Sequence, residues 1–210
     1  MNVLVLAPHP DDETIGCGGA LCLHAAKGDR VVVVFLTSGE LGLKDKAPQK
    51  AWKIRESEAK AAAQHLGVAR LEFLRLPDWM VGEQIKKGAR MLQPVLEQEL
   101  PDLAYLPHPQ DGHPDHQAAL PLLQAALRGV RRPALELRAY EIWTPLAEFD
   151  AVEDISRVMR RKLQALRAHR SQLVEFDYER AVRGLNEYRG ALAGKCAFAE
   201  VFQTLHLKMS

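Results

Sequence analysis

The sequence VLVLAPHPDDE, residues 3–13, opens the unit that determines the fold. Residues 3–7 and 31–36 are short apolar runs rich in β-branched side chains, which is typical of buried strands. Between them, residues 14–27 have the character of a helix, and Gly28 is a residue type that commonly ends one. Strand, helix and strand within about thirty residues indicate a βαβ unit, so we expect a parallel sheet with helices on both faces.

The same alternation continues along the chain. The pattern predicts helices at 52–66, 85–99 and 114–127 and strands at 71–76 and 103–106, with a kink or break at Pro121. The C-terminal part predicts a strand at 134–143, a long amphipathic helix at 154–173, a helix at 178–192 and an edge strand at 196–207. Because no linker or repeat divides the chain, we expect residues 1–210 to form a single α/β domain with a Rossmann-like, mainly parallel sheet.

The composition restricts the class of partner and the compartment. The 210 residues carry a formal net charge of +1, so no overall field would attract nucleic acid or an anionic membrane. No stretch approaches the roughly 20 apolar residues that span a bilayer, and the N-terminus lacks the features of a signal peptide. The three cysteines cannot form a closed disulfide framework. We therefore expect a cytoplasmic protein with a small-molecule partner and no membrane insertion, and we leave a homo-oligomer open.

Two clusters of histidines and carboxylates follow predicted strands. His9, Asp11 and Asp12 come directly after the first strand, and a second cluster after the fourth strand contains His113, Asp115 and His116. In an open parallel sheet, the loops at the carboxyl ends of the strands build the ligand crevice, especially where the strand order reverses. If the first and fourth strands flank that reversal, the two clusters converge although they are far apart in the sequence.

Two imidazoles and one carboxylate match the ligand set of a catalytic zinc site, which keeps positions for water and substrate. Three alternatives compete with this interpretation. Acids in the first turn of a helix are common without any metal. A non-haem iron enzyme uses the same ligand set, but it would give Asp11 no clear use. A nucleotide-binding module with a structural metal would employ Gly16, Gly18 and Gly19, whose spacing differs from GxGxxG.

The motifs at residues 7–13, APHPDDE, and 113–116, HPDH, resemble the paired signatures of the LmbE-like, or PIG-L, N-deacetylase family. Further similarity at residues 37–40, 55–56, 66–67, 77–78 and 169–172 extends the resemblance over nearly the whole chain. The resemblance implies a zinc-dependent hydrolase that removes an N-acyl group, expected to be N-acetyl, from a small N-acetylglucosaminyl-type conjugate.

The resemblance also implies roles for individual residues. It implies that Zn²⁺ is bound by three ligands: His9, Asp12 and His116. Asp11 would act as general base toward the water that zinc activates and would then protonate the departing amine. His113 would stabilise the tetrahedral oxyanion, and Asp115 would orient and polarise a neighbouring imidazole.

The resemblance is less specific about substrate contacts. It suggests that sugar hydroxyls or an attached anionic group are held by Glu40, Arg55 and Asp78. Helix-surface pairing of Arg55, and turn capping by Glu40 and Asp78, explain the same residues equally well. Asp111 stands where some family members carry a substrate-contacting tyrosine, which leaves the oxyanion helper open. His108 and His169 are expected to be mainly structural, and residues 44–50 form a predicted exposed loop that would cap the site.

Overall fold

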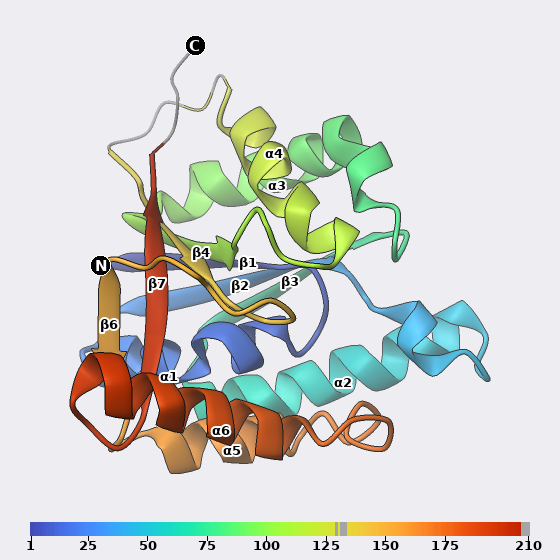
Figure 1. The fold of residues 1–210 in the computed structure, drawn as a ribbon. Helices are drawn as coiled ribbons and strands as arrows, with labels where there is room; N and C mark the ends of the chain where they lie inside the picture. The colour runs from blue at the N-terminus through green and yellow to red at the C-terminus, as the bar shows by residue number, and fades with distance from the viewer. Residues whose placement is uncertain (129, 131–133, 207–210) are drawn as a thin grey trace.

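The computed structural model describes residues 1–128, 130 and 134–206. A seven-stranded sheet runs through them in the order β3-β2-β1-β4-β5-β7-β6 (Figure 1). Its strands are β1 (Asn2–Ala7), β2 (Arg30–Thr37), β3 (Arg70–Leu76), β4 (Leu103–Pro107), β5 (Glu136–Tyr140), β6 (Ala151–Asp154) and β7 (Ala199–Leu205). The first five strands are parallel, and β7 pairs antiparallel with both β5 and β6. The expected mainly parallel α/β fold is confirmed.

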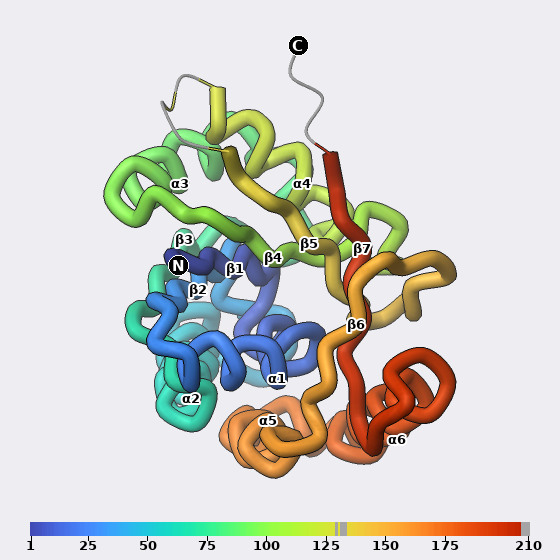
Figure 2. Tube along the Cα trace, turned by 90° about the vertical axis from the view of Figure 1, so that its left-hand side faces the viewer, coloured from blue at the N-terminus to red at the C-terminus, as the bar shows by residue number. Residues whose placement is uncertain are grey.

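Helices cover both faces of the sheet, as Figure 2 shows. One face carries α1 (Asp12–Ala26), α2 (Pro48–Leu66), α5 (Met159–Leu166) and α6 (Tyr178–Arg189). The other face carries α3 (Ile85–Glu99) and α4 (Pro114–Leu127). Short turns of 3-10 helix lie at Glu40–Leu43 and Val81–Gln84, and a π-helical turn at Gly190–Gly194 follows α6.

The alternation of side chains along β1 explains why both faces are covered. Val3 and Val5 pack into the core beneath α1 and α2, whereas Leu4 and Leu6 pack into the core beneath α3 and α4. Fully burying one such side chain contributes about 1.5–3 kcal/mol, so a register shift that exchanged the two faces would be strongly disfavoured. The register of β1 against its neighbours is therefore well determined, and so are the positions of the loops that leave it.

The predicted helix at 154–173 is wrong at its start and its end. Residues 151–154 form β6, which pairs with β7, and the helix α5 spans only Met159–Leu166. The Asp154 carboxylate accepts hydrogen bonds from the backbone N–H and the hydroxyl of Ser156, a local turn that ends the strand and delays the helix. The pairing of β6 with β7 is a long-range contact that helical periodicity does not reveal.

The strand predicted at 196–207 exists as β7, but it is not an edge strand. It lies between β5 and β6, so β6 forms the edge; Leu207 falls outside the described residues. The kink or break predicted at Pro121 is not a break, because α4 runs through this residue. The predicted loop at 44–50 is shorter than expected, since Pro48 occupies the first turn of α2, a position that suits proline.

The strand order reverses between β1 and β4. The chain steps from β1 to β2 and β3 on one side and returns to place β4 on the other side of β1. The two loops leaving the carboxyl ends of β1 and β4 are thus neighbours, as ligand-binding loops are at the switch point of a doubly wound sheet. No helix in the described ranges is long and apolar enough to cross a membrane.

Candidate active site

The loop after β1 and the loop after β4 each deliver their polar residues at the start of a helix. Asp11 immediately precedes α1 and has a φ of 147°, a backbone conformation that L-residues rarely adopt. Its backbone N–H donates to Glu13 Oε2 at 3.2 Å. His113 precedes α4, and its Nδ1 accepts a hydrogen bond from the backbone N–H of Asp115 at 3.2 Å.

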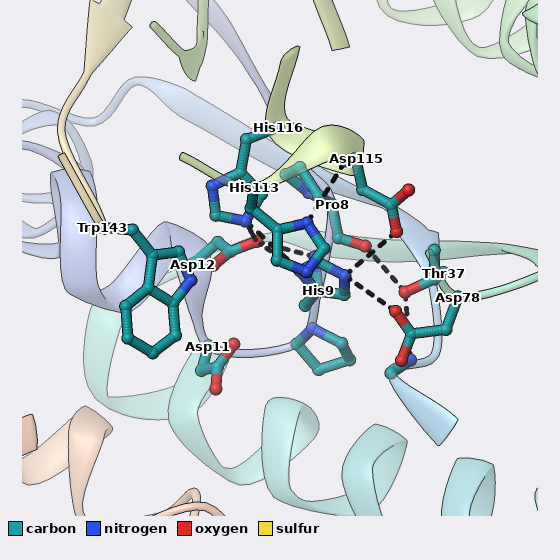
Figure 3. Close-up of polar contacts among 12 residues, drawn as sticks. Pro8, His9, Asp11, Asp12, Thr37, Asp78, His113, Asp115, His116 and Trp143 are labelled. Atoms are coloured by element: carbon teal, nitrogen blue, oxygen red, sulfur yellow. Dashed lines mark hydrogen bonds and ion pairs between the residues drawn. The ribbon is translucent and has the colours of Figure 1, made fainter. Parts of the chain in front are cut away.

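Three ligand atoms from the two loops form a small, nearly equilateral triangle (Figure 3). His9 Nδ1 and His116 Nε2 each lie 3.2 Å from Asp12 Oδ2, and the two nitrogens are 3.3 Å apart. All three side chains are buried. A tetrahedral zinc with bonds of about 2.0–2.1 Å requires ligand atoms about 3.3 Å apart. The donor set therefore fits a four-coordinate metal ion in both atom type and spacing.

Each imidazole of the triangle has a carboxylate against its other ring nitrogen. His9 Nε2 lies 3.0 Å from Asp78 Oδ1 and 3.3 Å from Asp115 Oδ2. His116 Nδ1 lies 2.9 Å from Asp111 Oδ1. Metal-binding histidines commonly make this second contact, which fixes the orientation of the ring and makes it a better ligand.

Other groupings of ligand atoms are possible around the same centre. His113 offers a ring nitrogen within 4.8 Å of those of His9 and His116, and Asp78 and Asp115 form a similar group with His9. The triangle with Asp12 fits better because its edges match the tetrahedral spacing, whereas Asp78 and Asp115 contact the opposite nitrogen of His9. His113 consequently stands beside the triangle, with its ring centroid 4.7 Å from that of His9.

The electrostatics differ sharply between the neighbouring aspartates. Burial favours the protonated form of Asp12, but the charges and hydrogen bonds of His116 and His9 outweigh it and hold the pKa of Asp12 far below its usual range. Burial raises the pKa of Asp11 to about 6, opposed mainly by the positive charge of Arg55. Two carboxylates adjacent in sequence therefore differ in proton affinity because their surroundings differ.

The histidines also divide by their surroundings. Burial disfavours the charged form of His116, yet Asp12 and Asp111 raise its pKa to about 9, and a metal ion would have to displace that proton. Burial and the nearby charges of His9 and His116 lower the pKa of His113 below its usual range. His113 is thus neutral at neutral pH.

The three expected substrate residues are engaged with the protein itself. Arg55 is 4% exposed; its Nη2 lies 3.1 Å from Asp11 Oδ2 and donates to Pro10 O, and its Nη1 donates to Gly39 O. Glu40 accepts hydrogen bonds from Trp52 Nε1 and from the backbone N–H of Asp78. Among the described residues that line the site cavity, Arg55 and Asp78 are present and Glu40 is not.

The sequence did not reveal the part that Asp111 plays. Besides His116, its fully buried carboxylate accepts hydrogen bonds from the backbone N–H groups of Trp143, Thr144 and His113. Its position five residues before a candidate ligand was the one available signal. His108, by contrast, contacts the Thr144 carbonyl with Nε2, and this contact agrees with the expected structural use.

A cavity of about 550 Å³ opens over the cluster. Its lining includes His9, Asp11, Asp12 and His113, and its mouth carries four aromatic side chains: Trp79, Trp143, Phe176 and Tyr178. A larger groove of about 740 Å³ between α2 and the segment around α5 holds none of the candidate catalytic or metal-binding residues. The smaller cavity is therefore the candidate active site.

Comparison with known proteins identifies similar chains. The family described as PIG-L, GlcNAc-PI de-N-acetylase, matches residues 4–127, which contain both loop clusters. A probable N-acetyl-alpha-D-glucosaminyl L-malate deacetylase 2 of Bacillus subtilis is 32% identical over 186 residues, covering 81% of this chain and 83% of the relative. A diacetylchitobiose deacetylase of Thermococcus kodakarensis is 29% identical over 216 residues, covering 92% of this chain and 79% of the relative.

A solved structure extends the similarity beyond the family match. The N,N'-diacetylchitobiose deacetylase of Pyrococcus horikoshii, in complex with an inhibitor, is similar with a TM-score of 0.85 and 26% sequence identity. The similarity covers 97% of this chain and 83% of that chain. The C-terminal strands and helices after residue 127 are therefore part of the shared fold.

Proposed function

The chain belongs to the PIG-L, GlcNAc-PI de-N-acetylase, family, and on that premise we propose that it is a zinc-dependent hydrolase that removes the N-acetyl group from a small N-acetylglucosaminyl-type conjugate. The N-deacetylase activity follows from the similarity to deacetylases across most of the chain. The single observation that carries the zinc proposal is the triangle of His9 Nδ1, Asp12 Oδ2 and His116 Nε2 with edges of 3.2–3.3 Å. We take residues 1–210 as one deacetylase domain and the cytoplasm as its compartment.

In this proposal the triangle binds the metal, and neighbouring carboxylates orient its two histidine rings. Zinc bound there would supply Lewis acidity to water and to the amide carbonyl. Asp78 and Asp115 orient the ring of His9, and Asp111 orients the ring of His116. The role of Asp115 in polarising a neighbouring imidazole is supported by its 3.3 Å contact with His9 Nε2.

Asp11 is suited to move the proton. As water attacks the carbonyl carbon, its proton passes to the Asp11 carboxylate; when the carbon–nitrogen bond breaks, the same proton passes to the leaving amine. A pKa of about 6 suits this exchange, because a base that is ionised at neutral pH but not strongly acidic can both accept and return a proton. Arg55, 3.1 Å away, favours the ionised form that begins the cycle.

His113 is suited to stabilise the oxyanion. Its Nδ1 accepts the backbone N–H of Asp115, so the neutral ring carries its proton on Nε2. Within the part of the chain that the structure describes, that N–H makes no other hydrogen bond, so it can donate to the oxygen of the tetrahedral intermediate, as preorganised donors do in acyl-transfer sites. Asp115 therefore serves two imidazoles, setting the tautomer of His113 and the orientation of His9.

Two of the expected substrate residues remain candidates for direct contact. Asp78 and Arg55 line the cavity, where they could meet sugar hydroxyls. Glu40 would act through Asp78, whose backbone N–H it accepts at 3.0 Å. The relatives named for glucosaminyl malate and diacetylchitobiose support an amino-sugar conjugate as the partner class.

The test combines metal analysis with acetate release. The isolated protein should contain about one zinc per chain, and the zinc-loaded protein should release acetate from N-acetylglucosamine conjugates equally well with and without oxygen. Full activity after exhaustive chelation would refute the metal-dependent mechanism. A requirement for iron and oxygen would instead favour the non-haem iron enzyme.

A further inference from the structure

Three aromatic side chains form one wall of the active-site cavity: Trp143, Phe176 and Tyr178, called the aromatic wall below. Trp143 lies in the loop after β5, and the other two flank the start of α6. Their ring centroids are 5.5–5.9 Å apart, so each ring contacts both others. Trp143 and Phe176 are each 47% exposed. The protein thus leaves a contiguous aromatic surface open at the mouth of its site, an arrangement typical of ligand contact.

The aromatic wall is tied to the reacting centre. The backbone N–H of Trp143 donates to Asp111 Oδ2 at 3.0 Å, and the other oxygen of that carboxylate contacts His116. Figure 3 shows the Trp143 ring beside Asp11 and Asp12, on the far side of His9 from Asp78. A group attached to the reacting sugar could therefore reach the wall while the amide lies over Asp11.

The charges around the cavity do not favour an acidic group at this position. Apart from the histidines, its lining contains two cations, Lys44 and Arg55, against four carboxylates: Asp11, Asp12, Asp78 and Glu175. Arg55 already pairs with Asp11, so even a divalent metal would only bring the lining near neutrality. A carboxylate or phosphate on the substrate would meet one uncommitted cation, Lys44, among the described lining residues.

Polar groups next to the wall suit a ring that carries hydroxyls. Gln172 and Glu175 line the same cavity, a few residues before Phe176 and Tyr178 in the sequence. No described residue forms a hydrogen bond with the hydroxyl of Tyr178, whose ring is half-buried against the wall. A pyranose presents C–H groups on its face and hydroxyls at its edge, which matches aromatic rings bordered by hydrogen-bonding side chains.

We propose that the aromatic wall is a subsite for a second, uncharged pyranose ring joined to the N-acetylated sugar. This inference rests on the proposed deacetylase function. The substrate class is then a neutral oligosaccharide-type conjugate rather than a carboxylated or phosphorylated one. Trp143 supplies the main stacking surface, and Phe176 supports it.

Binding to the metal-free protein tests the subsite independently of catalysis. Calorimetric titration with N,N'-diacetylchitobiose should give about tenfold weaker binding for Trp143→Ala, while Trp143→Phe retains most of the affinity. Val174→Ala is the matched control, because Val174 is 88% exposed in the same segment and lies outside the cavity lining. Unchanged binding by both Trp143→Ala and Phe176→Ala, in folded protein, would overturn the subsite.

Kinetics of the zinc-loaded protein give the second test. The preference in kcat/KM for the disaccharide over N-acetylglucosamine should fall about tenfold in Trp143→Ala and should persist in Val174→Ala. A wild-type preference for an N-acetylglucosaminyl malate or an apolar acyl glycoside over the disaccharide would also overturn the proposal. If no acetate is released from any sugar but disaccharide binding still depends on Trp143, the deacetylase function fails and the subsite stands.

Discussion

The Asp111 carboxylate contacts Nδ1 of His116 at 2.9 Å, on the side of the ring away from the candidate metal-binding Nε2. The same carboxylate accepts the backbone N–H groups of Trp143 and Thr144, so one buried side chain joins the β4 loop to the loop that carries the aromatic wall. Asp111 consequently supports the metal triangle and the mouth of the cavity together.

Replacing Asp111 should weaken metal binding without removing a ligand. Asp111→Asn keeps an oxygen for the backbone donors but removes the negative charge beside His116, so zinc affinity should fall by about 10- to 100-fold. Competition with a chromogenic chelator measures this. Asp45→Asn, which changes an exposed carboxylate of the 44–47 loop, is the control. Equal zinc affinity in wild type and Asp111→Asn would assign Asp111 to loop packing alone.

The stability of the protein in acid should depend on Glu99, the last residue of α3. It accepts hydrogen bonds from Arg30 and Arg70, at the starts of β2 and β3, and chiefly the Arg30 contact lowers its pKa despite burial. A lowered folded-state pKa means that the stabilisation is present above the ordinary value of 4.5 and is lost as the pH falls through the folded-state value.

Glu99→Gln should therefore lower the free energy of unfolding by about 1 kcal/mol at pH 7, a modest value because both arginines are partly exposed. The difference from wild type should shrink as the pH is lowered toward 3. Urea denaturation at both pH values measures it, with Glu97→Gln, an exposed neighbour, as the control. A difference that stays constant with pH would show that Glu99 contributes through packing rather than charge.

How far the sequence predicts the site depends on whether contacts are local. His9 and Asp12 lie in one loop after a strand that is apolar throughout, so strand, loop and ligand spacing were all visible. The reversal between β1 and β4 brings in His116, and the βαβ pattern made that convergence predictable. The antiparallel pairing of β6 with β7 was not predictable, because residues 151–154 lack a strong strand pattern. They form a strand only by pairing with residues some 48 positions further along the chain.

Arg55 illustrates a different limit. Its place near a site was inferred, but its direction was not, because helical spacing does not say whether a guanidinium points to a ligand or to a loop carbonyl. The structure places it against Asp11, Pro10 O and Gly39 O. The exposed aromatic wall could not be predicted for a related reason: Trp143 and Phe176 belong to loops whose contact depends on the whole C-terminal arrangement.

Removing the charge of Arg55 should shift the pH dependence of the reaction. Burial raises the pKa of Asp11 to about 6 and the Arg55 charge opposes this rise, so Arg55→Met should raise it further. The acid limb of kcat/KM should then move to higher pH. A full pH profile of both proteins measures the shift, with Arg90→Met on the exposed side of α3 as control. If Arg55→Met raises the KM for the conjugate but leaves the acid limb of the pH profile in place, Arg55 is a substrate contact instead.

The neighbouring aspartates give the sharpest test, because they share one loop but differ in their contacts. Asp12→Ala removes one of three proposed ligands and should lower zinc affinity strongly, since Asp12 Oδ2 is an apex of the triangle. Asp11 makes no contact within that triangle; its carboxylate pairs with Arg55. Zinc content of the two purified variants, measured after dialysis against a weak chelator, should therefore differ.

Asp11→Asn should keep the metal yet lose turnover. Asparagine has nearly the shape of aspartate, which already adopts the unusual φ of 147° here, so the loop should remain folded. Without a group that accepts and returns the proton, kcat should fall by roughly 10²- to 10⁴-fold, and the acid limb assigned to Asp11 should disappear from the pH profile. The measurement requires saturating zinc and metal analysis on the same sample, because lost metal would otherwise resemble lost proton transfer. Wild-type turnover by Asp11→Asn under those conditions would exclude Asp11 as the base and direct the search for the proton acceptor to His113 or Asp115, the other ionisable residues of the proposed catalytic group.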